Sequence, residues 1–490
     1  MILRDIVNNC RVVSVTGNEL SQITAVTPDS RKVTEGSLFL AVKGYQSDGH
    51  NYIAKAVAAG ARAVVYESSA ELSQETKEAL GKVEAAVCVE DSRWALAQVA
   101  DNYYDHPSRK LKLVGITGTN GKTTTVTLLY NLFMSLGYNC GLLSTIANYV
   151  GREESETTNT TSDPLTINRL MARMVEEGCE YCFMEVSSIG MEQQRVAALD
   201  FDCGIFSNLT HDHLDYHKTF AEYLRCKKLF FDSLGAKATA IINTDDKNGR
   251  VMVQNTAARV VTYALSTMAD HTCRIMEQGL DGMLLKIDGQ EVWTPIIGRH
   301  NAYNLLAIYT TAVELGTDKE EALVGISKLS SAKGRLETLK GPRNLSVIID
   351  YAHTPDALEN ILDTLKEAAP GAYITTVFGC GGDRDRTKRP QMAAIAEKYS
   401  DRIIVTSDNS RTEKTEDIIE EIKAGFSAKG LAKAISIPDR REAIRTAILT
   451  APQGSGILLA GKGHETYQII GSETRHFDER EIVKEVFEAI

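Results

Sequence analysis

The chain has 490 residues, of which 43% are hydrophobic and 24% are charged, a composition typical of a globular protein with several cores. Its formal net charge of −11 argues against nucleic acid or an anionic membrane as a partner. No apolar run approaches the roughly 20 residues that span a bilayer, and the first residues lack the apolar core of a signal peptide. The 9 cysteines are an odd number that fits no closed disulfide framework, and we expect a cytoplasmic enzyme.

Composition shifts along the chain predict three domains, at residues 1–108, 109–334 and 335–490. The first is predicted to be a small α/β module with short strands around a helical stretch at 51–59. The second opens with an apolar strand at 111–117, which indicates a buried strand.

A glycine-rich turn follows the strand 111–117 and leads into a helical pattern. This arrangement is typical of a phosphate loop, because glycines let backbone N–H groups converge on phosphate oxygens at a helix N-terminus. The predicted ATP-binding residues here are Gly118, Thr119, Asn120, Gly121, Lys122, Thr123 and Thr124. Lys122 is expected to reach the terminal phosphates and Thr123 to hold Mg²⁺. The strict spacing is not met, because Ile116 lies five residues before Gly121, so a simple helix-capping turn is the alternative.

Residues 208–217 are rich in metal-binding side chains, with the sequence Asn-Leu-Thr-His-Asp-His-Leu-Asp-Tyr-His. One interpretation is a binuclear metallohydrolase site, but Tyr216 stands where the pattern requires histidine. Another is Mg²⁺ beside ATP, which needs only one or two protein ligands. His213 and Glu185, which ends a predicted strand, are then the expected ligands. A purely structural role for the histidines is the third interpretation.

Lys227 lies on the apolar stripe of a predicted helix that begins near Phe220. Burial of an ammonium group is costly, so a lysine at this position either extends to the rim or is uncharged. An uncharged amine can react with CO₂ to form a carbamate, which would place a carboxylate-like group beside Mg²⁺. Lys228 points away from this stripe.

The third domain alternates apolar strands with helix-like patterns. The strands are predicted at 346–350, 373–378, 402–406 and 456–460. Strands that alternate with helices indicate parallel βαβ units, whose ligands bind at the carboxyl ends of the strands. The predicted fold class is therefore α/β, with mostly parallel sheets.

These motifs together resemble those of the Mur ligases of peptidoglycan synthesis, and the resemblance spans nearly the whole chain. It implies a uridine-binding N-terminal domain, a central P-loop ATPase domain and a Rossmann-like C-terminal domain. It also implies ATP and Mg²⁺ as cofactors and a monomer. The implied reaction activates the carboxylate of UDP-N-acetylmuramoyl-L-alanyl-D-glutamate as an acyl phosphate and couples it to the amine of meso-diaminopimelate.

The resemblance assigns site residues throughout the chain. For the UDP-substrate it implies Ser30, His50, Thr160, Thr161, Ser187, Arg195 and Lys227. For ATP it adds Asn301, Asn304, Arg335 and Asp350. For the amino acid it implies Arg384, Asp408, Asn409, Arg411, Gly461 and Glu465. The implied catalytic residues are Lys122, Lys227, Glu185 and His213, and the implied metal ligands are Thr123, Glu185, His213 and carbamylated Lys227.

Three positions depart from the family pattern, because Ser410 and Ser162 replace prolines and Ile189 replaces a histidine. Arg411 can bind the distal carboxylate of diaminopimelate in bidentate fashion. It would repel the side-chain ammonium of lysine, which has no carboxylate at that end. The departures leave open the same reaction with L-lysine or another amino acid. The sequence is also compatible with a related ligase such as folylpolyglutamate synthetase, with a nucleotide-binding relative without catalysis, and with a metallohydrolase using the 211–217 histidines.

Overall fold

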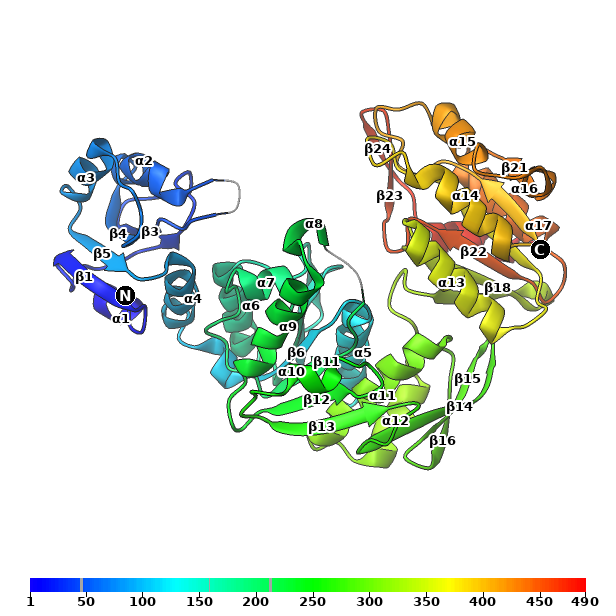
Figure 1. Cartoon of the computed structure of the whole chain (residues 1–490), viewed down its shortest axis with the longest axis horizontal. Coiled ribbons are helices and arrows are strands. Elements are labelled where there is room, and N and C mark those ends of the chain that lie inside the picture. The colour runs from blue at the N-terminus through cyan, green and yellow to red at the C-terminus, as the bar shows by residue number, and fades with distance from the viewer. Residues whose placement is uncertain (45–46, 158, 211–213) are drawn as a thin grey trace. The chain divides into compact units, whose positions relative to one another are not determined.

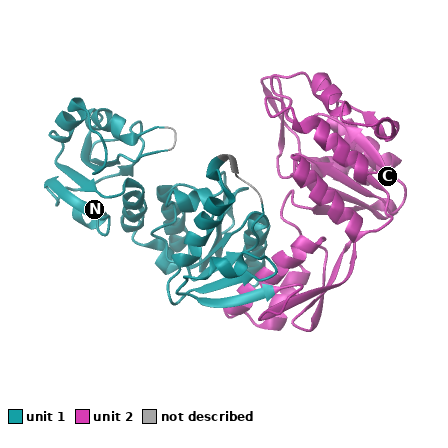
Figure 2. Cartoon of the chain, in the orientation of Figure 1, with its two compact units in different colours: residues 1–263 teal, residues 264–490 magenta. Residues whose placement is uncertain are grey.

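The computed structural model describes residues 1–44, 47–157, 159–210 and 214–490. It divides into two compact units, Met1–Tyr263 and Ala264–Ile490 (Figure 2). Among the described helices, none combines the length and the apolar character needed to cross a bilayer. The predicted domain boundaries at 108 and 334 are a finer division than these two units and stay a prediction.

The first unit begins with a five-stranded sheet of order β1-β5-β4-β3-β2, in which only β1 is antiparallel to its neighbour. Leu38 and Leu40 pack in one apolar cluster and Phe39 in another, so the sheet is covered on both faces. Its elements are α1 (Leu3–Ile6), β1 (Val12–Gly17), β2 (Val26–Thr27), β3 (Ser37–Leu40), η1 (Gly49–Tyr52), α2 (Ile53–Ala58), β4 (Ala61–Glu67), α3 (Gln74–Leu80), β5 (Ala85–Val89) and α4 (Ser92–Tyr103).

The remainder of the first unit contains the strands that carry the phosphate loop. Its elements are η2 (Pro107–Lys110), β6 (Lys112–Thr117), α5 (Lys122–Ser135), β7 (Cys140–Leu143), β8 (Asn148–Val150), β9 (Glu153–Ser155), α6 (Pro164–Glu176), β10 (Tyr181–Glu185), α7 (Ser188–Glu192), β11 (Cys203–Phe206), α8 (Leu214–His217), α9 (Phe220–Asp232), β12 (Thr239–Asn243), α10 (Gly249–Met252) and β13 (Arg259–Ala264). The strand order is β13-β12-β11-β6-β10-β7-β8-β9, parallel from β13 to β7. The carboxyl ends of β6, β10 and β11 are therefore neighbours.

The second unit begins with an antiparallel meander and two helices (Figure 1). They are β14 (His271–Gly279), β15 (Gly282–Ile287), β16 (Gln290–Thr294), α11 (Arg299–Glu314) and α12 (Lys319–Ser327). The elements that follow are β17 (Glu337–Gly341), η3 (Pro342–Asn344), β18 (Leu345–Asp350), α13 (Pro355–Ala368), β19 (Ile374–Phe378), α14 (Lys388–Tyr399), β20 (Arg402–Val405), α15 (Thr415–Lys423), α16 (Ala428–Lys433), β21 (Ala434–Ser436), α17 (Arg440–Thr450), β22 (Gly456–Ala460), β23 (Tyr467–Ile470), β24 (Glu473–His476) and α18 (Glu479–Glu488).

The C-terminal sheet has the order β17-β18-β22-β19-β20-β21 and is parallel from β18 to β21. Alternate strand residues bury against opposite layers: Phe378 packs with α13, α14 and α15, and Val377 packs with α17 and α18. The predicted strands of this domain are confirmed as β18, β19, β20 and β22. Because these strands are adjacent and parallel, the loops that follow them share one edge of the sheet.

Candidate active site

The phosphate loop joins β6 to α5 and is anchored on the segment after β11. Lys122 is the first residue of α5, and its Nζ donates to the carbonyl oxygens of Gly118 and Thr119, both at 2.9 Å. Gly118 has a φ of +154°, and a Cβ there would lie 1.9 Å from the Oγ of Ser207. The Ser207 hydroxyl in turn donates to the Asn120 carbonyl at 2.7 Å. Only glycine therefore fits at position 118. The N–H groups of the loop lie at the N-terminus of α5, the positive end of the helix dipole.

Lys227 is buried on α9, with 1% of its surface exposed, as its place on the apolar stripe predicts. Its Nζ donates to the Gly118 carbonyl at 2.7 Å and lies 4.6 Å from the ring centre of Tyr223. Lys122 donates to the same oxygen. The two amines therefore share one acceptor, and the carbamylation of Lys227 stays a prediction.

A cavity of about 170 Å³ brings together residues that are far apart in the sequence. Thr161 organises one wall: its hydroxyl donates to the Glu185 carbonyl at 2.9 Å and accepts from the Ser187 N–H at 3.0 Å. Arg195 donates from Nη1 to the Thr161 carbonyl at 2.5 Å. The lining residues are Lys122, Asn159, Thr160, Thr161, Ser187, Ser188, Ile189, Arg195 and Lys227. The predicted substrate residues of this unit, apart from Ser30 and His50, therefore meet at one site with the phosphate-loop lysine.

Glu185 ends β10 and presents an oxygen that suits a cation. Its Oε1 accepts from the backbone N–H of Thr145 at 2.8 Å. Its Oε2 is buried, and among the described residues nothing donates a hydrogen bond to it. A buried carboxylate oxygen in this state is costly unless a cation binds it, and oxygen ligands are those that Mg²⁺ prefers.

The histidine cluster is only partly described. His211 and His213 lie outside the described residues. His217 is buried, and its Nε2 is 2.9 Å from the Ser188 Oγ. Within the described parts of the chain, no group of three or more His, Cys, Asp or Glu side chains is placed to hold a metal.

Ser30 and His50 lie beside the N-terminal sheet, Ser30 in the turn after β2 and His50 in η1. His50 is buried, and its Nε2 accepts from the Glu67 backbone N–H at 3.0 Å. Its Nδ1 is therefore the protonated nitrogen, and it donates to Asp48 Oδ1. His50 thus ties its own loop to β4, and its predicted contact to the UDP-substrate stays a prediction.

The predicted nucleotide contacts of the second unit are well ordered by internal hydrogen bonds. Asn304 donates from Nδ2 to Asn301 Oδ1 at 3.0 Å, and both side chains are buried. Asp350 accepts from the N–H groups of Leu336 at 2.7 Å and Ala352 at 2.9 Å. Burial raises the pKa of Asp350 to about 6. Asp350 therefore holds the turn that carries Arg335.

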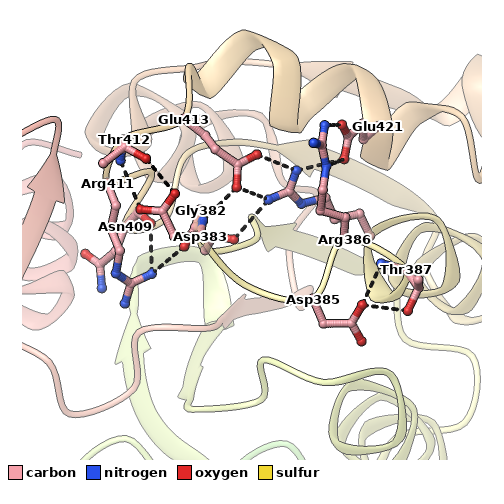
Figure 3. Close-up of polar contacts among 12 residues, drawn as sticks. Gly382, Asp383, Asp385, Arg386, Thr387, Asn409, Arg411, Thr412, Glu413 and Glu421 are labelled. Atoms are coloured by element: carbon pink, nitrogen blue, oxygen red, sulfur yellow. Dashed lines mark hydrogen bonds and ion pairs between the residues drawn. The ribbon is translucent and has the colours of Figure 1, made fainter.

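Three loops after β19, β20 and β22 carry the predicted amino-acid site. Arg411 donates from Nη1 to the Gly382 carbonyl at 2.9 Å, and Figure 3 shows these two loops side by side. Asn409 donates from Nδ2 to Glu465 Oε2 at 2.9 Å. At Gly461 a Cβ would lie 2.6 Å from the Asp408 carboxylate. Polar contacts thus join Arg411, Asn409 and Glu465, and Gly461 lies close to Asp408, whereas Arg384 is exposed on the first loop.

Lys462 lies among these loops and was not singled out by the sequence analysis. It is fully buried, and its Nζ donates to Glu465 Oε2 at 3.0 Å and to Asn409 Oδ1 at 3.2 Å. The signal was its place in a Gly-Lys-Gly run directly after a strand. Thr145, which binds Glu185, carries no comparable sequence signal.

Fold and geometry together define a phosphate-loop α/β protein with a cluster of polar loops at one edge of its C-terminal sheet. Family models match in three segments: the Mur ligase family catalytic domain at residues 22–104, the Mur ligase middle domain at 116–312, and the Mur ligase glutamate ligase domain at 334–463. The chain belongs to the Mur ligase family, whose members are ATP-dependent, amide-forming ligases. The predicted family, the three-domain α/β fold and the enzyme class are confirmed.

Individual relatives match over their full length. A UDP-N-acetylmuramoyl-L-alanyl-D-glutamate--2,6-diaminopimelate ligase of Cytophaga hutchinsonii is 49% identical over 490 residues, 100% of each chain. The ligase of the same name from Parabacteroides distasonis is 50% identical over 488 residues, 99% of each. A solved structure of a ligase with this name has a TM-score of 0.74 at 30% identity, covering 100% of this chain and 99% of the other. Folylpolyglutamate synthase of Thermotoga maritima, with a TM-score of 0.59 at 17% identity over 74% of this chain and 89% of its own, shares the fold alone.

Proposed function

We propose that this chain couples meso-diaminopimelate to UDP-N-acetylmuramoyl-L-alanyl-D-glutamate, with hydrolysis of ATP to ADP and phosphate, in peptidoglycan synthesis. The observation that carries the proposal is the 49% identity, over 100% of both chains, to a Cytophaga hutchinsonii protein named for this reaction. The cavity beside the phosphate loop and the paired loops of the C-terminal sheet support it. A hydrolase built on the 211–217 histidines has no such support.

ATP binds along the phosphate loop, residues 118–124, where Lys122 and the N-terminus of α5 neutralise phosphate charge. By the family assignment, Asn301, Asn304, Arg335 and Asp350 of the second unit also contact ATP. Ser30 and His50 contact the uridine part of the second substrate. Thr160, Thr161, Ser187 and Arg195 hold its peptide part, because they line the cavity that contains Lys122.

Thr123, Glu185 and carbamylated Lys227 would hold Mg²⁺, together with His213, which lies outside the described residues. The buried Glu185 Oε2, which receives no hydrogen bond from any described residue, supports this assignment. When bound, Mg²⁺ neutralises charge on the transferred phosphoryl group. The carbamate forms when the uncharged Lys227 amine attacks CO₂, which creates a C–N bond and releases one proton. This reaction replaces an uncharged amine beside Gly118 with an anion, which the Lys122 ammonium attracts.

The reaction proceeds through an acyl phosphate. An oxygen of the D-glutamate side-chain carboxylate attacks the γ-phosphorus, and ADP leaves. The uncharged diaminopimelate amine then attacks the carbonyl carbon, an amide bond forms, and phosphate leaves with one proton from the amine. The chain contributes chiefly by positioning and by charge neutralisation.

The C-terminal loops select the amino acid. Arg384 and Arg411 bind its carboxylates, and Asp408, Asn409 and Glu465 accept hydrogen bonds from its distal ammonium, beside the close approach at Gly461. Lysine lacks the distal carboxylate, so Arg411 finds no partner in it. The enzyme works as a monomer, which size-exclusion chromatography with light scattering would test.

The decisive experiment measures ATP-dependent phosphate release from the UDP-dipeptide with meso-diaminopimelate or L-lysine. We expect release to require the UDP-dipeptide and to be strongly faster with diaminopimelate. A preference for lysine would refute the role of Arg411. Hydrolysis of another substrate without ATP, with bound zinc, would instead support a metallohydrolase.

A further inference from the structure

Arg389 on α14 is fully buried and is held by two carboxylates. Its Nη1 donates to Glu413 Oε2 at 2.9 Å and its Nη2 to Glu413 Oε1 at 2.9 Å. Nη1 also donates to Glu421 Oε2 at 2.7 Å. A buried guanidinium in a bidentate pair with a carboxylate is held in one orientation, because both groups are planar and two hydrogen bonds join them.

The same carboxylate reaches the backbone of the loop that follows β19. Glu413 Oε1 accepts from the Asp383 N–H at 2.6 Å, and Arg389 Nη2 donates to the Gly381 carbonyl at 3.3 Å. The residue between them is Gly382, whose carbonyl accepts from Arg411 at 2.9 Å. Figure 3 shows Glu413, Asp383, Gly382 and Arg411 joined by these contacts.

Both loops contain backbone that needs outside support. Asp383 has a φ of +56° and Arg411 a φ of +50°, the left-handed region that side chains other than glycine seldom adopt. The Thr412 hydroxyl donates to Asp383 Oδ1 at 2.6 Å, and the Gly382 N–H donates to the Asn409 carbonyl at 2.9 Å. The two loops are therefore fixed to each other, and Glu413 fixes the pair to Arg389.

We propose that Glu413, locked by Arg389, is a positioning residue that sets the guanidinium of Arg411 and so selects an amino acid with a distal carboxylate. The inference rests on the proposed role of Arg411 in amino-acid binding. Glu413 itself touches no substrate; it acts by fixing the Gly382 carbonyl that orients Arg411. Arg389 also lowers the pKa of Glu413 to about 2, so this carboxylate stays ionised at neutral pH.

Glu421 provides a matched control. It binds the same Arg389 and also pairs with Arg386, but its described partners lie on α14 and the turn before it, not on the Arg411 loop. Glu413→Gln and Glu421→Gln therefore make the same chemical change on the same arginine. Only the first changes the acceptor of the Asp383 N–H, which belongs to the same peptide as the Gly382 carbonyl, whereas Glu421 reaches this loop through the exposed Arg386 side chain.

The test compares kcat and KM for meso-diaminopimelate, L-lysine and ATP in these two variants and in Arg411→Ala. We expect Glu413→Gln to raise the KM for diaminopimelate about ten-fold and to leave the KM for ATP unchanged. The ratio of kcat/KM for diaminopimelate to kcat/KM for lysine should fall. Glu421→Gln should stay within about two-fold of the natural chain. Thr412→Val, an exposed change that removes one neutral hydrogen bond, should raise the same KM roughly three-fold and serves if Glu413→Gln does not fold.

Equal effects of the two glutamine variants would overturn the inference, as would a matching rise in the KM for ATP. If Arg411→Ala raises the KM for diaminopimelate while Glu413→Gln and Thr412→Val do not, the positioning role fails and the amino-acid site stands. If Arg411→Ala changes nothing, the assignment of the amino-acid site fails, and this inference fails with it.

Discussion

Replacing Lys227 with alanine removes the amine that the structure places 2.7 Å from the Gly118 carbonyl. If this amine carries a carbamate, the variant loses a negative charge beside the metal and the triphosphate. Opposite unit charges about 4 Å apart, at an effective dielectric constant of about 20, attract each other by about 4 kcal/mol. That energy corresponds to about 10³ in rate. We therefore expect kcat to fall by about this factor, measured as phosphate release with all three substrates saturating.

Short-chain carboxylic acids should restore part of the activity of Lys227→Ala, because the truncated side chain leaves space for a small carboxylate. Lys228→Ala is the control. Lys228 pairs with Asp232 one turn along α9, at 2.5 Å, and its loss should change activity by less than about two-fold. Full activity in Lys227→Ala, or an equal loss in Lys228→Ala, would refute the carbamate.

Three further predictions concern the rest of the site. Lys462→Met should raise the KM for diaminopimelate at least about ten-fold without changing the KM for ATP, because it leaves the Glu465 carboxylate without its buried cation. Steady-state kinetics would measure both KM values, and an equal rise in the two would contradict the prediction. Gly118→Ala should abolish ATP binding in calorimetry, since its Cβ would meet a serine hydroxyl at 1.9 Å, whereas Gly137→Ala, also at positive φ but with nothing within 4 Å, should bind normally. Burial raises the pKa of Asp350 to about 6 from 3.8, so the folded chain holds this proton more tightly than the unfolded chain. Its contribution to the free energy of unfolding is then full below pH 4 and declines as the pH rises to about 6; Asp350→Asn should lose that slope in denaturant titrations, and an unchanged slope would contradict the assignment.

The sequence pattern within a single strand or helix was sufficient to predict that element and its buried face. The four predicted strands of the C-terminal domain correspond to β18, β19, β20 and β22, because fully buried strands are continuous apolar runs. Helical periodicity placed Lys227 on the buried face of α9, where it is 1% exposed. The predicted helix at 51–59 is shorter, because its first turn is the 3₁₀ helix η1.

Residues whose role depends on long-range contacts were not predictable in this way. Thr145 reaches Glu185 from the loop after β7, and only the order of the parallel strands makes them neighbours. The hairpin of β23 and β24 brings the Ile469 N–H to Asn409 Oδ1 at 2.9 Å, across 60 residues of sequence. Such partners carry no spacing signal, because the fold sets their distance.

The charges around the phosphate loop give an independent reason to expect a modified lysine. Lys122 and Lys227 both donate to the Gly118 carbonyl, and yet the nearby buried Glu185 Oε2 receives no hydrogen bond from any described residue. A buried carboxylate oxygen in that state is costly unless a cation binds it. A carbamate at Lys227 has the opposite sign to an ammonium, and a divalent cation between it and Glu185 would satisfy both. The proposal that Lys227 is carbamylated accounts for both the Glu185 oxygen and the crowded carbonyl, and the Lys227→Ala variant tests it.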